Sequence, residues 1–179
     1  MLLVPDSMID LQSGQYAPLL TIRPATPADE DAIWSILEPI LRAGETYALP
    51  RDWSRPDALA YWLAKDHEVF VAEGDGRVLG TYYLHANQRG GGAHVANCGY
   101  ITAPDSGGRG VATTMCRHSL RHAAGRGFRA MQFNFVVSAN ERAVRLWRRL
   151  GFNVVGTIPR AFEHPLLGYV DALVMHKTL

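Results

Sequence analysis

A glycine-rich turn followed by a helix is the part of this sequence whose residue types point most directly to chemistry. Gly107, Gly108 and Gly110 come after an apolar strand and precede residues 112–123, whose apolar side chains repeat at helical spacing. Glycines let backbone N–H groups converge on an anion, and a helix N-terminus adds a positive partial charge. The segment therefore indicates a phosphate-binding turn, with a plain tight turn as the alternative. It lacks the lysine of a P-loop and the third glycine of a dinucleotide fingerprint, where Thr113 stands.

The charge distribution favours an anion at this turn. The formal net charge is +1, yet residues 109–149 carry nine arginines and one glutamate, whereas residues 1–108 carry seven basic and fourteen acidic side chains. Nearly all the positive potential therefore begins at the glycine turn. A solvated basic helix face is the alternative, and the position beside the turn argues against it. No recognition helix or aromatic stacking module accompanies the charge in the sequence, so a nucleic-acid partner is not expected.

A second block of residues further along the chain makes the pattern specific. The blocks consist of Gly110, Val111 and Ala112, followed by Asn140, Ala143, Leu146, Trp147, Gly151 and Phe152. Together they resemble the GNAT superfamily of N-acetyltransferases, whose turn reads Q/R-x-x-G-x-G/A and whose later block reads N-x-x-A-x-x-L-Y-x-x-x-G-F. Two positions depart from that pattern. Gly107 stands at the Q/R position, and Trp147 stands where many members carry a tyrosine acid.

The resemblance implies acetyl-CoA as the acetyl donor and a homodimer as the assembly. Backbone N–H groups of the strand before the turn would bind the thioester carbonyl and the pantetheine arm, the turn would hold the pyrophosphate, and the later asparagine would orient cofactor or water. The cofactor-binding residues implied are Tyr100, Ile101, Thr102, Gly107, Gly108, Arg109, Gly110, Val111, Ala112, Asn140, Ala143 and Trp147. Trp147 is expected to pack against the cofactor or the sheet.

The sequence also resembles a narrower branch of the superfamily, which acetylates proline analogues such as azetidine-2-carboxylate and hydroxyproline. In that branch, asparagines on two strands that splay around the cofactor hold the substrate, and they correspond to Asn97 and Asn134. Polar amides inside a sheet are costly unless partnered, so both fit a polar pocket. A structural amide bonded to a neighbouring loop is the alternative for each. Glu45, Tyr47 and Tyr83 are further substrate-side candidates, although Glu45 and Tyr47 equally suit a solvated loop.

Acetyl transfer to an amine needs a neutral amine, a stabilised oxyanion and a protonated thiolate. We expect Asn97 to position the amine or a proton-carrying water, and Asn134 to bind the carboxylate side of the substrate. No strong general base stands out. Two alternatives stay open: the same chemistry on another acceptor, such as a phosphinothricin-like amino acid, a polyamine or a protein N-terminus, and an acyl-CoA sensor without turnover.

The order of strands and helices predicts a mixed α/β sheet with helices packed on it. The resemblance implies that this sheet is mostly antiparallel, with a splayed central strand pair and about four flanking helices. Residues 1–18 should be a flexible extension and residues 19–179 one acetyltransferase domain. Pro39 should kink or stop the first helix, a capping box at Ser138 should open the last helix, and Gly151 should end it. Strands are expected at 20–23, 69–72, 78–84, 94–102, 130–137, 152–158 and 169–176, and residues 159–168 should form an irregular loop.

Several other classes of protein are not expected. The longest apolar runs are short and the N-terminus lacks a signal-peptide pattern, so we expect a soluble, cytoplasmic protein without a membrane partner. Cys98 and Cys116 have no metal or disulfide spacing and should be small buried apolar side chains. His118 and His122 have the spacing of a metal pair but lack a third ligand, so surface histidines and no metal site are expected.

Overall fold

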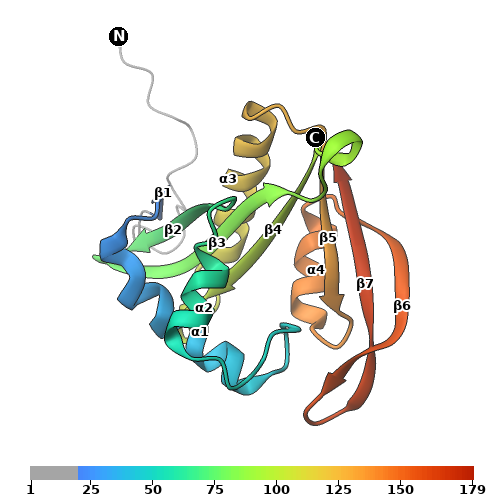
Figure 1. Cartoon of the computed structure of the whole chain (residues 1–179), viewed down its shortest axis with the longest axis horizontal. Helices are drawn as coiled ribbons and strands as arrows, with labels where there is room; N and C mark the ends of the chain where they lie inside the picture. Colours follow the sequence, from blue (N-terminus) through green and yellow to red (C-terminus); the bar gives the residue numbers. More distant parts are fainter. Residues whose placement is uncertain (1–19) are drawn as a thin grey trace, which may run out of the picture.

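A seven-stranded mixed sheet forms the centre of the computed structural model, which describes residues 20–179 (Figure 1). Its strand order is β1-β2-β3-β4-β5-β7-β6; β4 and β5 are parallel and the other neighbours are antiparallel. The strands are β1 (Thr21–Pro24), β2 (Glu68–Gly74), β3 (Arg77–Ala86), β4 (Val95–Thr102), β5 (Ala130–Val137), β6 (Asn153–His164) and β7 (Gly168–Thr178). The predicted class, strand number and element order are confirmed. The N-terminal extension expected at residues 1–18 lies outside the described residues.

The four α-helices cover the two faces of the sheet in pairs. They are α1 (Glu30–Ala43), α2 (Arg55–Trp62), α3 (Val111–Gly125) and α4 (Glu141–Arg149). Side chains alternate between the faces of a strand, so neighbouring residues enter different cores. Tyr82 packs in the core under α3 and α4, and Tyr83 packs in the core under α1 and α2. Within residues 20–179, no helix is long and apolar enough to span a membrane.

The sheet opens between its two central parallel strands, as Figure 1 shows. The pairing of β4 with β5 in the described chain comprises Val95↔Ala130 and Ala96↔Met131. Directly after these pairs, the Asn97 side-chain amide donates a hydrogen bond of 2.8 Å to the carbonyl of Gln132. A side chain therefore replaces the backbone ladder at the point where the strands separate, and the β4 and β5 edges beyond it face a gap.

Helix caps differ from the sequence prediction at two places. Pro39 lies inside α1, which continues to Ala43 and ends at Gly44 with φ +65°. Pro39 and Ser35, whose carbonyl loses its helical partner, are both exposed, so that carbonyl is accessible to solvent and the helix tolerates the proline. The capping box expected at Ser138 is also wrong: Asn140 is the N-cap of α4, and its Oδ1 accepts a hydrogen bond of 3.2 Å from the Ala143 N–H.

The loop expected at residues 159–168 is instead part of a long β6–β7 hairpin. Strand β6 continues to His164 through an irregularity between Ile158 and Phe162. Arg160 adopts φ +52° there, and its N–H donates to Asp171 Oδ1 at 2.8 Å across the hairpin. This contact from β7 stabilises the bulged strand, whereas the sequence pattern alone predicts an irregular loop there. Gly151 does end α4, with φ +89°.

Candidate active site

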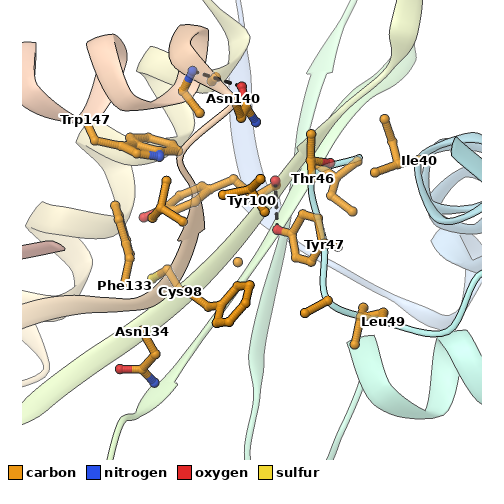
Figure 2. Close-up of a pocket in the computed structure, with 18 of the residues that line it drawn as sticks. Ile40, Thr46, Tyr47, Leu49, Cys98, Tyr100, Phe133, Asn134, Asn140 and Trp147 are labelled. Atoms are coloured by element: carbon orange, nitrogen blue, oxygen red, sulfur yellow. Dashed lines mark hydrogen bonds between the residues drawn. The ribbon is translucent and has the colours of Figure 1, made fainter. Parts of the chain in front are cut away.

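A cavity of about 430 Å³ occupies the gap between β4 and β5 (Figure 2). One wall is the loop between α1 and α2, represented by Thr46, Tyr47 and Leu49. The opposite wall comes from β5 and α4, with Phe133 and Trp147 facing that loop across the opening. Because both walls line one cavity, a molecule lying in the gap would contact segments that are far apart in the sequence.

The α4 side of the cavity is an aromatic wall. Trp147 packs against Tyr100 and Phe133, with both ring centroids 5.1 Å away, and it is buried. The Tyr100 hydroxyl forms a 2.6 Å hydrogen bond with Ser119 on α3, and burial raises the pKa of this phenol well above its usual value. Asn140 and Ala143 line the same end of the cavity. The aromatic side chains fix the shape of this wall, and Trp147 carries no acidic proton to donate.

The glycine turn borders this end of the cavity. Gly108 and Gly110 have positive φ angles of 78° and 74°, and Gly110 is the N-cap of α3. The first N–H groups of a helix have no partner within the helix, so they are available to an anion. Of the predicted turn residues, the cavity lining includes Ala112, whereas Val111 is buried beneath the turn. The first turn of α3 therefore reaches the cavity at Ala112, whereas the predicted residues Gly107, Gly108, Arg109 and Gly110 lie outside the lining.

The side chain of Arg109 is fixed by an ion pair to the neighbouring β2–β3 turn. Its guanidinium binds the carboxylate of Asp75 in the turn between β2 and β3. A second pair joins Arg77 of β3 to Asp105 with a distance of 2.7 Å. These contacts fasten the segment before α3 to the neighbouring hairpin. The Arg109 backbone belongs to the turn, as predicted, but its side chain acts as an anchor.

The opposite end of the cavity is rich in tyrosine. Tyr47 donates a hydrogen bond of 3.0 Å from its hydroxyl to the Tyr100 carbonyl, which latches the α1–α2 loop onto β4. Tyr61 and Tyr83 also line the cavity, and their hydroxyl oxygens are 3.3 Å apart. Burial raises the pKa of Tyr47 and Tyr83, so these phenols stay protonated at neutral pH. Glu45 is exposed and does not belong to the cavity lining in the described chain.

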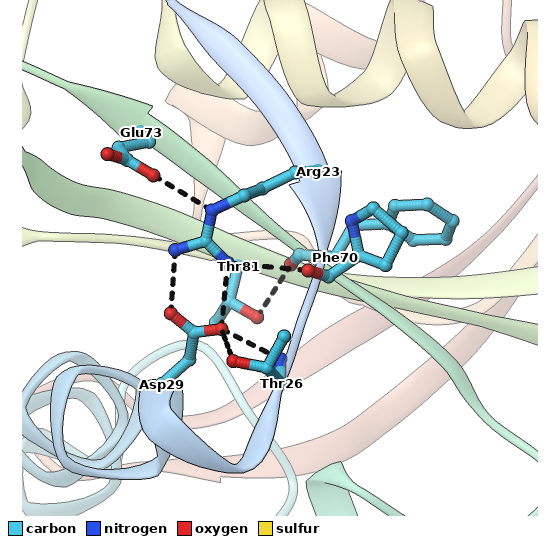
Figure 3. A network of polar contacts seen from close by, with 7 residues as sticks. Arg23, Thr26, Asp29, Phe70, Glu73 and Thr81 are labelled. Carbon is cyan, nitrogen blue, oxygen red and sulfur yellow. Dashed lines mark hydrogen bonds and ion pairs between the residues drawn. The ribbon is translucent and has the colours of Figure 1, made fainter.

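Two polar contacts fix the helices that carry this wall, and Figure 3 shows the first of them, around Arg23 and Asp29. Asp29 at the start of α1 receives two hydrogen bonds of 2.8 Å from the Arg23 guanidinium and further bonds from the backbone N–H and hydroxyl of Thr26. Arg23 also donates to Glu73 on β2 at 2.8 Å. On α2, the Trp62 indole donates to the Thr81 hydroxyl at 3.0 Å. These bonds set the position of α1 and α2 against the sheet.

The two predicted asparagines both line the cavity, and both already have protein partners. Asn97 is buried and its amide N–H bonds to the Gln132 carbonyl. Asn134 accepts from the Gln132 side chain at 2.8 Å and donates to Asn87 at 2.6 Å. Both amides therefore have a structural role, which was the alternative considered for them in the sequence. Their remaining hydrogen-bonding capacity is what a substrate could use.

Two histidine rings behind this end of the cavity, those of His67 and His85, escaped the sequence analysis. His67 stacks on Tyr83 with ring centroids 4.2 Å apart and an interplanar angle of 12°, and its ring lies 4.7 Å from that of His85. Burial, followed by the neighbouring His67, lowers the pKa of His85, so this imidazole is neutral at pH 7. The rings come from the loop after α2 and from β3, and no sequence spacing connects them.

Charged and metal-binding side chains are sparse around the cavity. Among residues 20–179, Arg142 is the one charged residue that lines it, and no group of three metal-ligand side chains is found. His118 and His122 are half-buried rather than surface residues, because they bond Tyr82 at 2.6 Å and Glu68 at 2.8 Å respectively. Both cysteines are buried and free of disulfides, as predicted.

Comparison with known proteins agrees with this geometry. The family model described as the acetyltransferase (GNAT) family matches residues 31–152. The structure of a GCN5-related N-acetyltransferase from Kribbella flavida is 42% identical, with a TM-score of 0.86, and the match covers 89% of this chain and 98% of that one. A phosphinothricin acetyltransferase from Sinorhizobium meliloti in complex with acetyl-CoA shares the fold at 20% identity, with a TM-score of 0.79 and coverage of 89% and 88%.

A curated relative matches a shorter segment. The N-acetyltransferase aca1 of Schizosaccharomyces pombe is 33% identical over 100 residues, which are 54% of this chain and 47% of that protein. The chain thus spans about half the length of the curated relatives it matches. The family match extends from α1 to the residue after Gly151, and so includes β4, the glycine turn, β5 and α4. The chain belongs to the acetyltransferase (GNAT) family.

Proposed function

We propose that this protein transfers the acetyl group of acetyl-CoA to the amine of a small amino or imino acid, with proline analogues as the first candidates. One observation carries the proposal: the cavity in the β4–β5 gap has the first turn of α3, preceded by the glycine turn, at one end and a wall of three tyrosines at the other. The first end suits a phosphorylated acyl donor, and the second suits a small acceptor. The cytoplasmic location and the homodimer expected from the sequence belong to the same proposal.

Two features of the donor end fit acetyl-CoA. Gly108 and Gly110 have positive φ angles and lead into α3, whose first N–H groups have no partner within the helix and could bind a phosphate. The edge of β4 from Asn97 onward has no β5 backbone partner in the described structure, so its outward N–H groups can bind carbonyl groups of an extended arm. Bound there, acetyl-CoA would supply an activated acyl group and a thiolate leaving group.

The acceptor end favours a neutral amine. Tyr47, Tyr61 and Tyr83 enclose it, and no carboxylate from residues 20–179 lines the cavity to hold the amine as a cation. A low-polarity wall lowers the pKa of an amine, which raises the fraction able to attack a carbonyl. The buried phenols of Tyr47 and Tyr83 keep their protons at neutral pH, because burial raises the pKa of each. β4 N–H groups facing the gap would stabilise the developing oxyanion.

Proton transfer in this site relies on weak groups. Trp147 replaces the tyrosine acid of the family pattern, and a thiol pKa of about 8.5 makes protonation of the leaving thiolate by water sufficient. Asn97 is the residue we assign to the amine or to a water that accepts its proton. Asn134 is the residue we assign to the carboxylate side of the acceptor. The assignment of both residues rests on their place in the cavity lining.

Another acceptor is a second candidate, and one observation favours it. The tyrosine-lined end contains no arginine or lysine from the described chain that would neutralise a carboxylate. A polyamine or another amine without a carboxylate would need no such partner. A non-catalytic acyl-CoA sensor is compatible with the donor end alone.

Thiol release from acetyl-CoA tests the function directly. The acceptor panel contains azetidine-2-carboxylate, cis-4-hydroxyproline, proline, phosphinothricin, methionine sulfoximine and spermidine. Turnover with the cyclic imino acids supports the proposal, turnover with spermidine alone moves it to the second acceptor class, and acetyl-CoA binding without any turnover supports the sensor.

Substituting Asn97 tests the site assignment. We expect Asn97→Ala to lower kcat/KM for the acceptor by about 10-fold or more, the usual effect of losing a positioning group, while the KM for acetyl-CoA stays unchanged. Asn153→Ala, which removes an exposed amide of β6 outside the cavity lining, is the matched control. Equal kcat/KM values for Asn97→Ala and the wild type would contradict the role of Asn97.

A further inference from the structure

Arg142 on α4 reaches over the glycine turn at the position where the family pattern has a side chain and this chain has none. Gly107 occupies the Q/R position of the turn. A Cβ atom built on Gly107 would lie 3.9 Å from both terminal guanidinium nitrogens of Arg142. The space that a glutamine or arginine at position 107 would enter is therefore next to a guanidinium that comes from another element.

Arg142 differs from the other arginines near the turn in having no carboxylate partner within residues 20–179. Arg109 pairs with Asp75, and Arg145, one turn further along α4, pairs with Glu141 at 2.7 Å. Arg142 also lines the cavity, which neither of these residues does. Its guanidinium is thus both placed at the donor end and available there.

The position of Arg142 in α4 is unfavourable without an anion nearby. It is the second residue of the helix, where the macrodipole is positive. A cation in the first turn of a helix destabilises the helix, whereas a negative charge stabilises it. The first turns of α3 and α4 both border the same end of the cavity, since Ala112 and Ala143 line it. An anion between them would be attracted by both helices and by Arg142.

We propose that Arg142 supplies the phosphate-binding cation that the turn lacks at Gly107, and that it binds a phosphate of the acyl donor through its two terminal nitrogens. The proposal rests on the proposed function, because it takes the donor to be a coenzyme A thioester. A guanidinium presents two parallel N–H donors that match two phosphate oxygens. The backbone of a turn does not provide such a pair of charged donors. Arg142 then determines how strongly the protein selects a phosphorylated donor over pantetheine alone.

The test compares the binding of CoA and of pantetheine, which lacks the phosphates, by calorimetry without any acceptor. We expect Arg142→Ala to raise the Kd for CoA by about 10- to 100-fold, the range for charge-assisted hydrogen bonds, and to leave the Kd for pantetheine unchanged. The Kd for CoA should also depend less on salt in this variant. Arg145→Ala is the matched control, because its guanidinium is on the same helix and already paired; its Kd for CoA should equal that of the wild type.

Restoring the missing side chain provides a second, independent readout. Gly107 has φ −56°, and the nearest atoms to an added Cβ are those of Arg142 at ordinary contact distance, so Gly107→Gln introduces no backbone strain. We expect Gly107→Gln to recover part of the CoA affinity lost in Arg142→Ala. The apo Arg142→Ala protein should unfold at or above the wild-type Tm, since a first-turn cation is removed.

The outcomes separate the two proposals. Tight CoA binding by the wild type and by Arg142→Ala alike would overturn the role of Arg142 while leaving the proposed function intact. An equal loss of CoA and pantetheine affinity in Arg142→Ala would show a general disturbance of the cavity and would also overturn it. Absence of CoA binding by the wild type would overturn both proposals.

Discussion

Gly99 on β4 allows the ring of Tyr83 to lie directly on the strand. The two residues are opposite one another in the antiparallel β3–β4 pair, and both line the cavity. A Cβ atom on Gly99 would lie 2.5 Å from Cε1, 2.6 Å from Cζ and 2.8 Å from Oη of Tyr83. Ordinary contacts between carbon atoms are about 3.5–4.0 Å, so Gly99→Ala must displace the ring by roughly 1 Å.

The surroundings of Tyr83 resist this displacement. The ring is 5% exposed, stacks on His67 and meets the Trp62 ring at 4.8 Å. Overpacking of such a site costs about 1–3 kcal/mol of unfolding free energy. A shift of about 1 Å in a group that positions a substrate costs up to ~100-fold in rate. We therefore expect Gly99→Ala to lose about 1–3 kcal/mol of stability and to lower acceptor kcat/KM by about 10- to 100-fold.

Urea unfolding and steady-state kinetics measure the two effects separately. The Kd for CoA should stay within about twofold of the wild type, because the ring belongs to the acceptor end. Gly91→Ala is the control, since a Cβ there meets no atom of residues 20–179 within 4 Å. In a Tyr83→Leu background the cost of Gly99→Ala should shrink, because the clashing atoms are gone. The reasoning is refuted if Gly99→Ala retains both the stability and the acceptor kcat/KM of the wild type.

Two further substitutions test the supports of the acceptor wall. Asp29→Asn should cost about 2–3 kcal/mol by urea unfolding at pH 7, less than a fully buried pair because 36% of the Arg23 side chain is exposed. Arg23 holds the pKa of Asp29 well below its usual value, so this stabilisation is fully present above about pH 4, the ordinary pKa of an aspartate, and declines progressively as the pH falls from there toward the lowered pKa; over that acidic range the stability of the wild type should approach that of the variant. Tyr47→Phe removes one hydrogen bond to Tyr100, worth about 1 kcal/mol, and should raise the acceptor KM several-fold without changing the acetyl-CoA KM.

A specific result would contradict each of these two predictions. Asp31→Asn removes an ion pair in which the carboxylate side chain is 85% exposed, and it should cost below about 0.5 kcal/mol; an Asp29→Asn variant as stable as Asp31→Asn would show that the buried network contributes little. A Tyr47→Phe variant with an unchanged acceptor KM would show that the loop stays in place without the latch.

Local signals in the sequence were sufficient for most of the fold. The Asp75 and Gly76 turn between two β-branched runs predicts the β2–β3 hairpin, and Gly151 predicts the end of α4, because each feature depends on neighbours in the chain. The apolar repeat after the glycine turn likewise predicts α3. The errors occur where a distant residue decides the conformation, as Asp171 does for Arg160 in the β6–β7 hairpin.

The candidate site was predictable at the donor end and less so at the acceptor end. The glycine turn and Asn140 lie in continuous blocks whose spacing is visible in the sequence. The acceptor end is assembled from the α1–α2 loop, α2, β3 and β4, so packing decides which side chains meet. Packing places Tyr61 in the cavity and leaves Glu45, close to Tyr47 in the sequence, outside it. The proximity of Arg142 to Gly107 also depends on packing, because Arg142 belongs to α4 and Gly107 to the turn before α3.

The short β4–β5 pairing also makes the centre of the sheet a seam between two parts of the molecule. Strands β1–β4 lie on one side of it and β5–β7 on the other, with two backbone pairs joining them at one end. Amides on the open edges exchange with solvent through local opening, whereas those in the β2–β3 ladder need larger unfolding. A ligand that crosses the seam lowers the population of the opened state in proportion to its occupancy. Slowed amide exchange along β4 and β5 thus becomes an intrinsic reporter of whether the gap is filled, independent of any chemistry that takes place in it.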